Sequence, residues 1–318
     1  MENTQRKESN FVSVVGYLHD SSAFVQKFLE KVTGVMQRHF DHYEVILVDD
    51  CCRDDSVEQV RAFVSRASQN VPVTIVTMSV WQGMELGMNA GVDISVGDFV
   101  FEFDSLEIDY EPELIFQAYQ KALTGYDIVT VGPVKNRSFS SSLFYRVFNA
   151  SSGSRYPIQT DVFRVLSRRA VNRVRAVSPT PAYRKAAYAA CGLKAYSMRD
   201  ERIPHTRDVN EALRFSLAAD SLVLYTNAGY RLSCGIAGLM LLATLLEFVY
   251  TLVIYLGGGK PIEGWTTTML VLTLGFFGVF LILAVVLRYL TLLVDLVFKH
   301  QRYLVEGIEK IQKEQSDA

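Results

Sequence analysis

The chain contains little cysteine and lacks the features that direct a protein through the secretory pathway. Its 318 residues include four cysteines, whose positions match neither metal-ligand spacing nor a disulfide framework. We therefore expect a reducing compartment. The first ten residues are polar and charged, without the apolar stretch of a cleavable secretory signal, and no internal repeat or low-complexity segment stands out. A secreted, disulfide-stabilised protein is thus not the expected class.

Long apolar runs are confined to the C-terminal third of the chain. Residues 232–256 are almost wholly apolar apart from Glu247, and residues 265–287 carry no charge. Each run exceeds the roughly 20 residues needed to cross a bilayer, so we predict transmembrane helices at 232–256 and 265–290. The connecting residues 257–264 are long enough only for a tight hairpin. Both flanking parts of the chain should then lie on one side of the membrane.

The charges beside these two segments predict which side that is. Basic residues flank the outer ends of the hairpin, namely Arg231, Arg288, Lys299, His300 and Arg302. The hairpin itself carries one Lys and one Glu, so the bias of positive charge predicts that both termini are cytoplasmic. We expect residues 206–231 to form an amphipathic segment along the membrane surface, and residues 291–318 to form a cytoplasmic tail.

Residues 1–205 have the pattern of a doubly wound α/β domain. Short apolar runs rich in β-branched residues predict five strands, at 11–15, 44–48, 73–77, 98–103 and 128–131. The stretches that alternate with them predict five helices, at 22–40, 56–68, 83–95, 112–123 and 170–177. A serine is expected to cap the first of these helices. Ligands of such domains bind beyond the carboxyl ends of the parallel strands.

Two of the predicted strands end in acidic residues. Asp49 and Asp50 follow the second strand, and Asp104, Glu107 and Asp109 follow the fourth. We expect these two strands to be neighbours, because their carboxylates could then hold a divalent cation, Mg²⁺ or Mn²⁺, that clamps a diphosphate. The alternative is that Asp104 caps a turn while the other acids face water.

Acidic and basic residues occupy different parts of this domain. Residues 41–127 hold seventeen Asp and Glu against four Lys and Arg, whereas residues 128–199 hold thirteen Lys and Arg against the single acid Asp161. Arg164 and Arg168 belong to a group of closely spaced arginines, a composition that suits a phosphate or anionic headgroups. The alternative is a solvated surface with a general attraction to anionic lipid.

The order of these motifs carries a family resemblance. The N-terminal half resembles the family 2 inverting glycosyltransferases of the GT-A fold, through Val48-Asp49-Asp50, Gly83 to Gly91, Gly97-Asp98, Asp104 and Pro112-Glu113. The C-terminal half is similar to the polyprenyl-phosphate glycosyltransferases, the group of dolichol-phosphate mannose synthase-like and bactoprenol glucosyltransferase-like enzymes, through Phe144-Tyr145, Asn149, Phe163-Arg164, Ser167-Arg168 and Gly264-Trp265-Thr266-Thr267. The resemblance covers nearly the whole chain, and it implies a Rossmann-like GT-A domain followed by two transmembrane helices.

The resemblance also implies roles for individual residues. A nucleotide-diphosphate sugar would be bound at Asp49, Asp50, Trp81 and Gly83. The metal would be held by Asp104 and Glu107, and Asp104 and Asp161 would be the catalytic carboxylates. The phosphate of a polyprenyl lipid, undecaprenyl or dolichyl, would be bound by Arg164, Arg168, Lys135 and Arg137. A homo-oligomer is implied as well, and no nucleic acid partner is expected.

Three departures from the family pattern leave alternatives open. Trp81 stands where the family has Asn, Leu106 stands where the second metal-binding Asp is usual, and Val162 replaces the acid before Phe-Arg, with Asp161 one place earlier. A phosphate acceptor is largely dianionic at neutral pH and hardly needs a general base. A different membrane acceptor with a hydroxyl group would need one, for which Asp161 is the candidate. A non-catalytic protein that binds a nucleotide sugar is the third possibility.

Overall fold

A computed structural model gives the architecture of the chain. It describes residues 6–67, 70–134, 145–150, 156–177, 181, 183–203 and 303–311, together with isolated positions between 235 and 293. Residues 1–149, 154–217 and 301–318 make up one compact unit, and residues 150–153 and 218–300 make up a second. The predicted amphipathic segment 206–231, and Lys135 and Arg137, lie outside the described residues.

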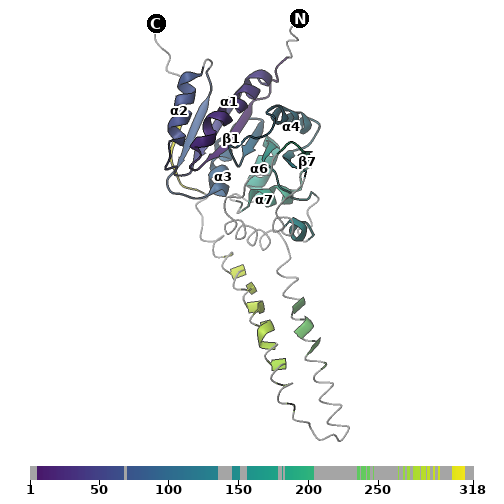
Figure 1. The fold of residues 1–318 in the computed structure, drawn as a ribbon. Helices are drawn as coiled ribbons and strands as arrows, with labels where there is room; N and C mark the ends of the chain where they lie inside the picture. The colour runs from purple at the N-terminus through teal and green to yellow at the C-terminus, as the bar shows by residue number, and fades with distance from the viewer. Residues whose placement is uncertain are drawn as a thin grey trace, which may run out of the picture. The chain divides into compact units, whose positions relative to one another are not determined.

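The first unit is built on an eight-stranded sheet with the strand order β7-β5-β6-β4-β1-β2-β3-β8. Figure 1 shows this unit with strands β1 and β7 labelled. The strands are β1 Val12–Leu18, β2 Tyr43–Asp49, β3 Val73–Met78, β4 Phe99–Phe103, β5 Ile128–Pro133, β6 Phe163–Ser167, β7 Ala195–Asp200 and β8 Val305–Ile311. Strand β6 runs antiparallel to β4 and β5, and β8 runs antiparallel to β3, whereas the other pairs are parallel.

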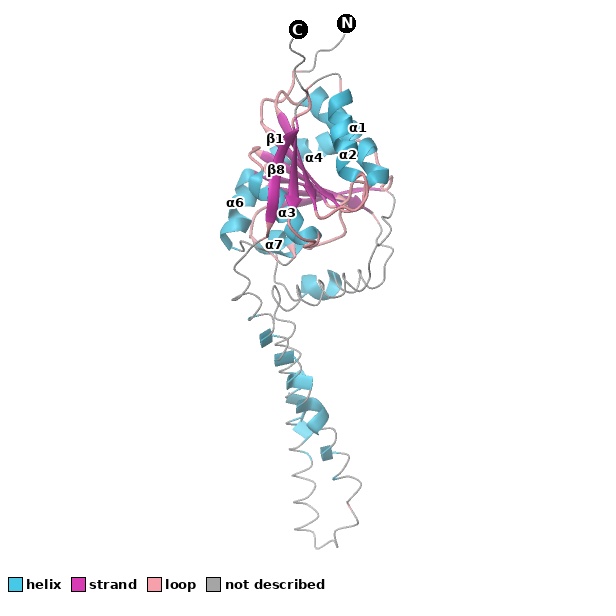
Figure 2. Cartoon of the chain, turned by 90° about the vertical axis from the view of Figure 1, so that its left-hand side faces the viewer, coloured by secondary structure: helices cyan, strands magenta, loops and turns pink. Residues whose placement is uncertain are grey.

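Helices cover both faces of this sheet, as Figure 2 shows in a view along its edge. The helices on one face are α1 Ser22–His39, α2 Ser56–Arg66 and α4 Glu113–Leu123. On the other face are α3 Met84–Ile94 and α6 Arg168–Val177, with α7 Arg184–Ala190 packed beside α6. The predicted doubly wound α/β architecture is confirmed.

The five strands and five helices expected from the sequence are all present, with ends that differ by a few residues. Two expectations about the sheet are wrong. Strand β1 lies between β2 and β4, so the two strands that end in acidic residues are not neighbours. Residues 305–311, expected within a tail, form the edge strand β8. The short segments β6, β7 and α7 were not predicted either.

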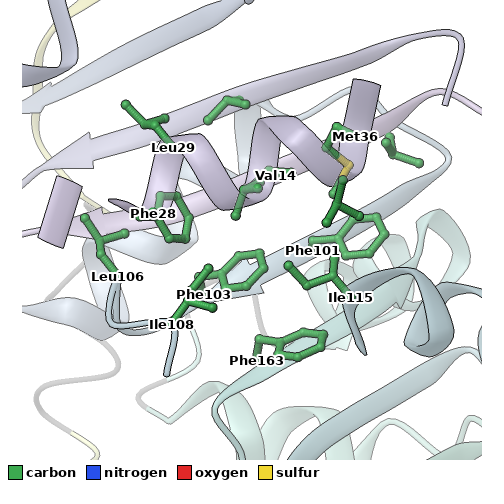
Figure 3. Packing of buried hydrophobic residues seen from close by; sticks show 14 of the residues in the cluster. Val14, Phe28, Leu29, Met36, Phe101, Phe103, Leu106, Ile108, Ile115 and Phe163 are labelled. Atoms are coloured by element: carbon green, nitrogen blue, oxygen red, sulfur yellow. The ribbon is translucent and has the colours of Figure 1, made fainter. Parts of the chain in front are cut away.

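The core between the sheet and α1 is rich in aromatic residues (Figure 3). Phe28 of α1 contacts Phe103 of β4 edge to face, with ring centroids 5.2 Å apart, and Phe103 stacks on Phe163 of β6 at 5.3 Å. Each buried aromatic side chain of this kind contributes roughly 1.5–3 kcal/mol through removal of apolar surface from water. Leu106 packs into the same cluster and is 4% exposed, so this residue of the Asp104 loop is a core residue.

Helix α3 lies unusually close to the sheet because of Gly91. A methyl group in place of its hydrogen would come within 2.5 Å of Val15 Cγ1 and 2.8 Å of Val48 Cγ2. Real carbon atoms do not approach so closely, so a larger residue would push α3 outward. This close packing fixes the position of the loop that precedes α3, which becomes important at the candidate site.

The start of α1 is held by a carboxylate from another loop. The expected serine cap is absent, because neither Ser21 nor Ser22 caps the helix through its side chain. Instead the Ser22 N–H donates to Asp54 Oδ2 at 2.9 Å, while Asp54 Oδ1 accepts from the N–H of Ser56 at 3.1 Å and from its hydroxyl. Burial opposes the charge, but the hydrogen bonds from Ser56 and Ser22 outweigh it and lower the pKa of Asp54 to about 2. One side chain therefore stabilises the N-termini of both α1 and α2.

The described residues of the second unit expose a large apolar surface. Most of the two predicted spans lies outside the described residues, and among those that are described no helix is both long and apolar enough to cross a bilayer. Large apolar side chains between 46% and 62% exposed recur along the described part of this unit, at Leu239, Leu242, Leu246, Leu272, Phe276, Phe277, Val279, Leu283, Val286, Leu290 and Leu293.

We expect Asp54→Asn to lower the free energy of unfolding at pH 7 by about 1–2 kcal/mol, because a neutral amide replaces the ionised cap of two helices. The folded-state pKa of Asp54 lies below its ordinary 3.8, so its contribution is full above pH 4 and is lost as the pH falls toward 2. Thermal unfolding of the wild type and of Asp54→Asn, at several pH values from 7 down to 3, measures how the difference between their free energies of unfolding narrows. The exposed neighbour Asp55, changed to Asn, is the matched control, and an equal effect in both variants would contradict the assignment.

Candidate active site

The carboxyl ends of β1, β2, β3 and β4 meet at one edge of the sheet. Asp49 ends β2, Asp50 follows it, and Asp104 follows β4. Strand β6 begins at the same edge, because Phe163 pairs with Phe103 in the antiparallel register. With β1 in between, the two acidic strand ends are about 10 Å apart across the sheet.

Asp50 organises the loop between β3 and α3, residues 79–83, which we call the donor loop. Its carboxylate is fully buried and accepts three hydrogen bonds, from the Gln82 N–H at 2.8 Å, the Gly83 N–H at 2.7 Å and the Tyr17 hydroxyl at 2.7 Å. Gly83 has a φ of +85°, a conformation open mainly to glycine, and it lets two successive N–H groups point at one carboxylate. Asp50 and Gly83, both predicted to bind a nucleotide sugar, are hydrogen-bonded to each other, and Asp50 fixes the donor loop; their binding role stays a prediction.

Three aromatic rings lie along the same edge. The ring centroids of Tyr17 and His19 are 6.4 Å apart, and those of His19 and Trp81 are 6.1 Å apart. Trp81 is 57% exposed, so its face is open to a ligand. Asp49 is buried at the end of β2 and accepts the Cys52 N–H at 2.9 Å, which shapes the turn after β2. Of the four residues predicted to bind a nucleotide sugar, Asp50, Trp81 and Gly83 are gathered around the donor loop.

The other half of this edge is a buried network of charges. Asp104 accepts from Arg164 Nη2 at 2.5 Å through one carboxylate oxygen, and from Arg184 Nη2 at 2.6 Å through the other. The two arginine side chains are 1% and 0% exposed. Both also donate to Glu102 Oε2, at 2.8 Å from Arg164 and 3.0 Å from Arg184, and Tyr188 donates to Glu102 Oε1.

Further ion pairs extend the network to neighbouring elements. Arg184 Nε donates to Glu85 Oε2 of α3 at 2.9 Å. Arg164 Nε donates to Asp161 Oδ2 at 3.1 Å, and Lys185 is ion-paired with Asp161. Glu85, Glu102, Asp104 and Asp161 therefore face Arg164, Arg184 and Lys185. We call these seven residues the buried charge network.

The network keeps two of its carboxylates, Asp104 and Asp161, ionised. Burial alone would raise the pKa of Asp104 and of Asp161, but in each case the charge of Arg164, followed by those of other nearby cations, outweighs it and holds the pKa below its usual value. Burial would likewise lower the pKa of Arg164 and Arg184, yet the carboxylates around them keep both pKa values well above the usual one. Such mutual compensation is what allows charges to persist away from water.

The structure separates the arginines expected to bind a lipid phosphate. Arg168 lies at the opposite edge of the sheet, where its guanidinium donates to the Gly97 carbonyl at 2.6 and 2.8 Å. Arg164 lies at the candidate site, but it is directed at Glu102, Asp104 and Asp161. The two are therefore not brought together.

Arg199 lies at this edge, and some N–H groups of its guanidinium make no hydrogen bond with the described residues. It lies in β7 opposite Gly132 of β5, and its Nη1 donates to the carbonyl oxygens of Thr160 at 2.6 Å and Pro133 at 3.2 Å. Its Nε and Nη2, and the hydroxyl of Thr160, are buried without a hydrogen-bond partner among the described residues. Burial lowers the pKa of Arg199, although the nearby Asp161 acts in the opposite direction.

A divalent metal does not fit Asp104 in this arrangement. Both of its oxygens are engaged by fixed guanidinium groups, and Leu106, the position of the usual second ligand, is in the core. Among the described residues, no three His, Cys, Asp or Glu side chains are grouped as a metal would require. The role of Glu107 as a metal ligand stays a prediction.

The sequence reasoning missed Arg184, Lys185, Glu85, Glu102 and Tyr188. One signal was available, because Glu102 is an acid inside an otherwise apolar central strand, Phe99–Phe103. A buried acid in such a place requires a cationic partner. Its partner could not be named, since Arg184 is 82 residues away along the chain.

Comparison with known proteins assigns the class that this fold and site belong to. Residues 13–174 match the family described as glycosyl transferase family 2, and the chain belongs to this family. It is therefore a glycosyltransferase. YkcC of Bacillus subtilis (strain 168), described as an uncharacterized glycosyltransferase, is 23% identical over 312 residues, which cover 93% of this chain and 94% of the relative.

Other similarities cover part of the chain or the fold alone. An undecaprenyl-phosphate 4-deoxy-4-formamido-L-arabinose transferase of Aeromonas hydrophila is 31% identical over 129 residues, which cover 41% of this chain and 38% of that protein. Among solved structures, the mannosyltransferase PcManGT from Pyrobaculum calidifontis, in complex with GDP-Man and Mn²⁺, has a TM-score of 0.52 and 16% identity, covering 85% of this chain and 87% of that one. This likeness shows the GT-A fold.

We expect Arg184→Met to lower the free energy of unfolding by about 3–5 kcal/mol, because Glu85, Glu102 and Asp104 would each lose a buried cationic partner. Adding Glu102→Gln removes one stranded charge, so the double variant should recover at least about 1 kcal/mol of that loss. Urea unfolding of the two single variants and the double variant gives the interaction energy. Strictly additive effects would contradict a direct interaction between these two side chains.

Proposed function

We propose that the protein transfers a sugar from a nucleotide-diphosphate donor to a polyprenyl phosphate at the cytoplasmic face of a membrane. Attack of the lipid phosphate on the anomeric carbon, with departure of the nucleoside diphosphate, is a single displacement that inverts the anomeric configuration. The carbon–oxygen bond to the diphosphate breaks as the bond to the lipid phosphate oxygen forms.

Binding of the nucleotide-diphosphate sugar is supported by the residues at the sheet edge around Asp50. The donor loop, the exposed ring of Trp81 and the buried Asp49 lie where open α/β sheets bind ligands. An exposed aromatic face suits stacking of a nucleotide base. The likeness to a mannosyltransferase in complex with GDP-Man points the same way.

The observation that favours a phosphate as the acceptor is that two carboxyl groups at the site have lowered pKa values. At the candidate site, the pKa values of Asp104 and Asp161 are both held below their usual values by the surrounding cations. A general base for a hydroxyl works best with a pKa near the working pH, so an Asp161 held ionised by Arg164 and Lys185 is a poor one. A phosphate acceptor needs no base. The similarity to an undecaprenyl-phosphate transferase supports the same acceptor class.

Arg199 is the residue that we propose to contact the acceptor phosphate. Its free Nε and Nη2 and the Thr160 hydroxyl are donors that a phosphate oxygen could satisfy, whereas Arg164 already donates to three carboxylates. Leaving buried donors unpaired costs roughly 1–3 kcal/mol each, so a ligand that pairs with them is favoured. Thr160 also lies next to Asp161, whose carboxylate is part of the buried charge network.

No step of the proposed reaction passes through a metal ion. Mg²⁺ or Mn²⁺ bound by Asp104 and Glu107 was the expectation from the sequence, but binding at Asp104 would have to displace Arg164 or Arg184 from its carboxylate. The two guanidinium groups supply the positive charge at this position instead. The chain's own residues at this edge therefore position the donor and balance the charge of Asp104.

The membrane part of the proposal has support from both units. Strand β8 follows the predicted spans 232–256 and 265–290, and it pairs with β3, which precedes them. Both flanks of the spans then share one side of the membrane, which requires an even number of crossings. The exposed apolar side chains of the second unit fit contact with lipid. The basic flanks of the spans favour the cytoplasm for both termini.

A non-catalytic protein that binds a nucleotide sugar is the second candidate. Leu106 in the core and Asp104 bound by two arginines are the observations that favour it, since both remove ligands that a metal-dependent family member would use. A measurement of sugar transfer distinguishes the two candidates, because only the first transfers a sugar.

We expect radiolabel from one nucleotide sugar of a panel of UDP and GDP sugars to appear on a short-chain polyprenyl phosphate in the presence of the purified full chain. Labelling should persist within about threefold in excess EDTA, because both oxygens of Asp104, the expected metal ligand, are already bound by Arg164 and Arg184. Asp104→Asn should reduce it at least about tenfold, because both guanidinium groups lose a charged partner at the site. Asp109→Asn, a change at an exposed acid of the same loop, is the matched control. No labelling by any donor, with nucleotide still bound, would favour the non-catalytic candidate.

We expect Arg199→Met to raise the KM for polyprenyl phosphate by about tenfold or more and to change the KM for the donor by less than about twofold, because only the acceptor phosphate meets its free donors. Arg169→Met is the control, since Arg169 is an exposed arginine ion-paired with Asp127. Kinetics with each substrate varied in turn separate the two constants. A rise confined to the donor KM would refute the assignment.

A further inference from the structure

The C-terminal strand β8 is fastened directly to the donor loop. The side-chain amide of Gln82 forms two hydrogen bonds with the backbone of Leu304, from Gln82 Nε2 to the Leu304 carbonyl at 2.8 Å and from the Leu304 N–H to Gln82 Oε1 at 2.9 Å. The Ser79 N–H donates to the same carbonyl at 3.0 Å. The amide of Gln82 thus continues the ladder between β3 and β8 beyond the end of β3.

Strand β8 is well held at its other positions. It pairs with β3 from Val73–Ile311 to Met78–Val305, with a register shift where β3 ends. Arg61 of α2 makes an ion pair of 2.9 Å with Glu309. The strand is therefore a fixed support, and Leu304, directly before it, is the residue that binds the donor loop.

Gln82 is bound on two sides by different parts of the chain. Its backbone N–H donates to Asp50, at the end of β2, and its side chain binds Leu304, 222 residues further on. Trp81, the exposed aromatic residue of the site, lies directly before it, and Gly83, which also donates to Asp50, lies directly after it. A change in the position of Leu304 must therefore move the residues on either side of Gln82.

We propose that Gln82 is a positioning residue, which makes the geometry of the donor loop depend on the segment that follows the predicted membrane spans. About a dozen residues connect the end of the second predicted span at 290 to Leu304, so insertion of the hairpin into a membrane fixes one end of this connection. The donor site is then complete when β8 is in place and is loosened when β8 is displaced. For its effect on donor binding, this inference rests on the proposed function.

The first test uses hydrogen exchange of the full chain in detergent. Gln82→Ala removes both bonds to Leu304 but keeps the backbone N–H that binds Asp50, so we expect residues 79–83 to exchange roughly tenfold faster, as expected for the loss of two hydrogen bonds. Arg61→Ala, which breaks the ion pair at the far part of β8, is the matched control and should leave these residues unchanged. Unchanged exchange in Gln82→Ala would overturn the proposal.

The second test separates positioning from general destabilisation. Gln82→Ala should raise the donor KM by about fivefold or more and leave the KM for polyprenyl phosphate unchanged, because only the donor loop is loosened. An equal rise in both constants, or none in the donor KM, would overturn the positioning role. If the wild-type chain transfers no sugar at all, the proposed function fails, while the exchange experiment still decides whether β8 holds the donor loop.

Discussion

The fully buried carboxylate of Glu102 is the constraint around which the candidate site is built. A carboxyl group buried in a central strand is tolerated only if cations and hydrogen bonds surround it, and here Arg164, Arg184 and Tyr188 do so. These partners come from β6 and α7, so satisfying one side chain fixes two elements against β4. The same two arginines then reach Asp104 and determine what that residue can bind.

The acidic part and the basic part of the sequence form ion pairs with each other inside the domain. Several arginines of the basic part pair with acids of the other part, as Arg164 does with Glu102 and Arg175 does with Asp93. Charge that could have formed a basic surface is thereby neutralised inside the domain. Arg199, with donors left over, is then the better candidate for contact with a phosphate. Both oxygens of Asp104, the expected metal ligand, are likewise bound by arginines of the chain itself.

After the two predicted membrane spans, the chain returns to the first unit and adds strand β8 to its sheet. In the proposed function, this strand connects the membrane hairpin to the donor loop. Strand β8 completes the sheet beside β3 and supports the donor loop through Leu304 and Gln82. Anchoring and donor binding would be independent if the chain ended in a free tail. Because β8 comes after the predicted spans, the proposed function implies that attachment to the membrane and the shape of the proposed donor site are joined by about a dozen residues of chain.

The sequence by itself determined the alternation of strands and helices up to Pro133, the acids at the ends of β2 and β4, and the family. Local periodicity and strand-end chemistry carry that information, because they depend on residues close together in the chain. The tertiary structure decided that β1 separates Asp49 from Asp104, that Arg168 faces the opposite edge and that residues 305–311 join the sheet. These outcomes depend on strand order and on ion pairs between residues some 60 to more than 200 positions apart, such as Arg184 with Glu102 and Arg61 with Glu309. No local pattern specifies such partners, since many acids and bases of this chain could pair and only packing selects among them.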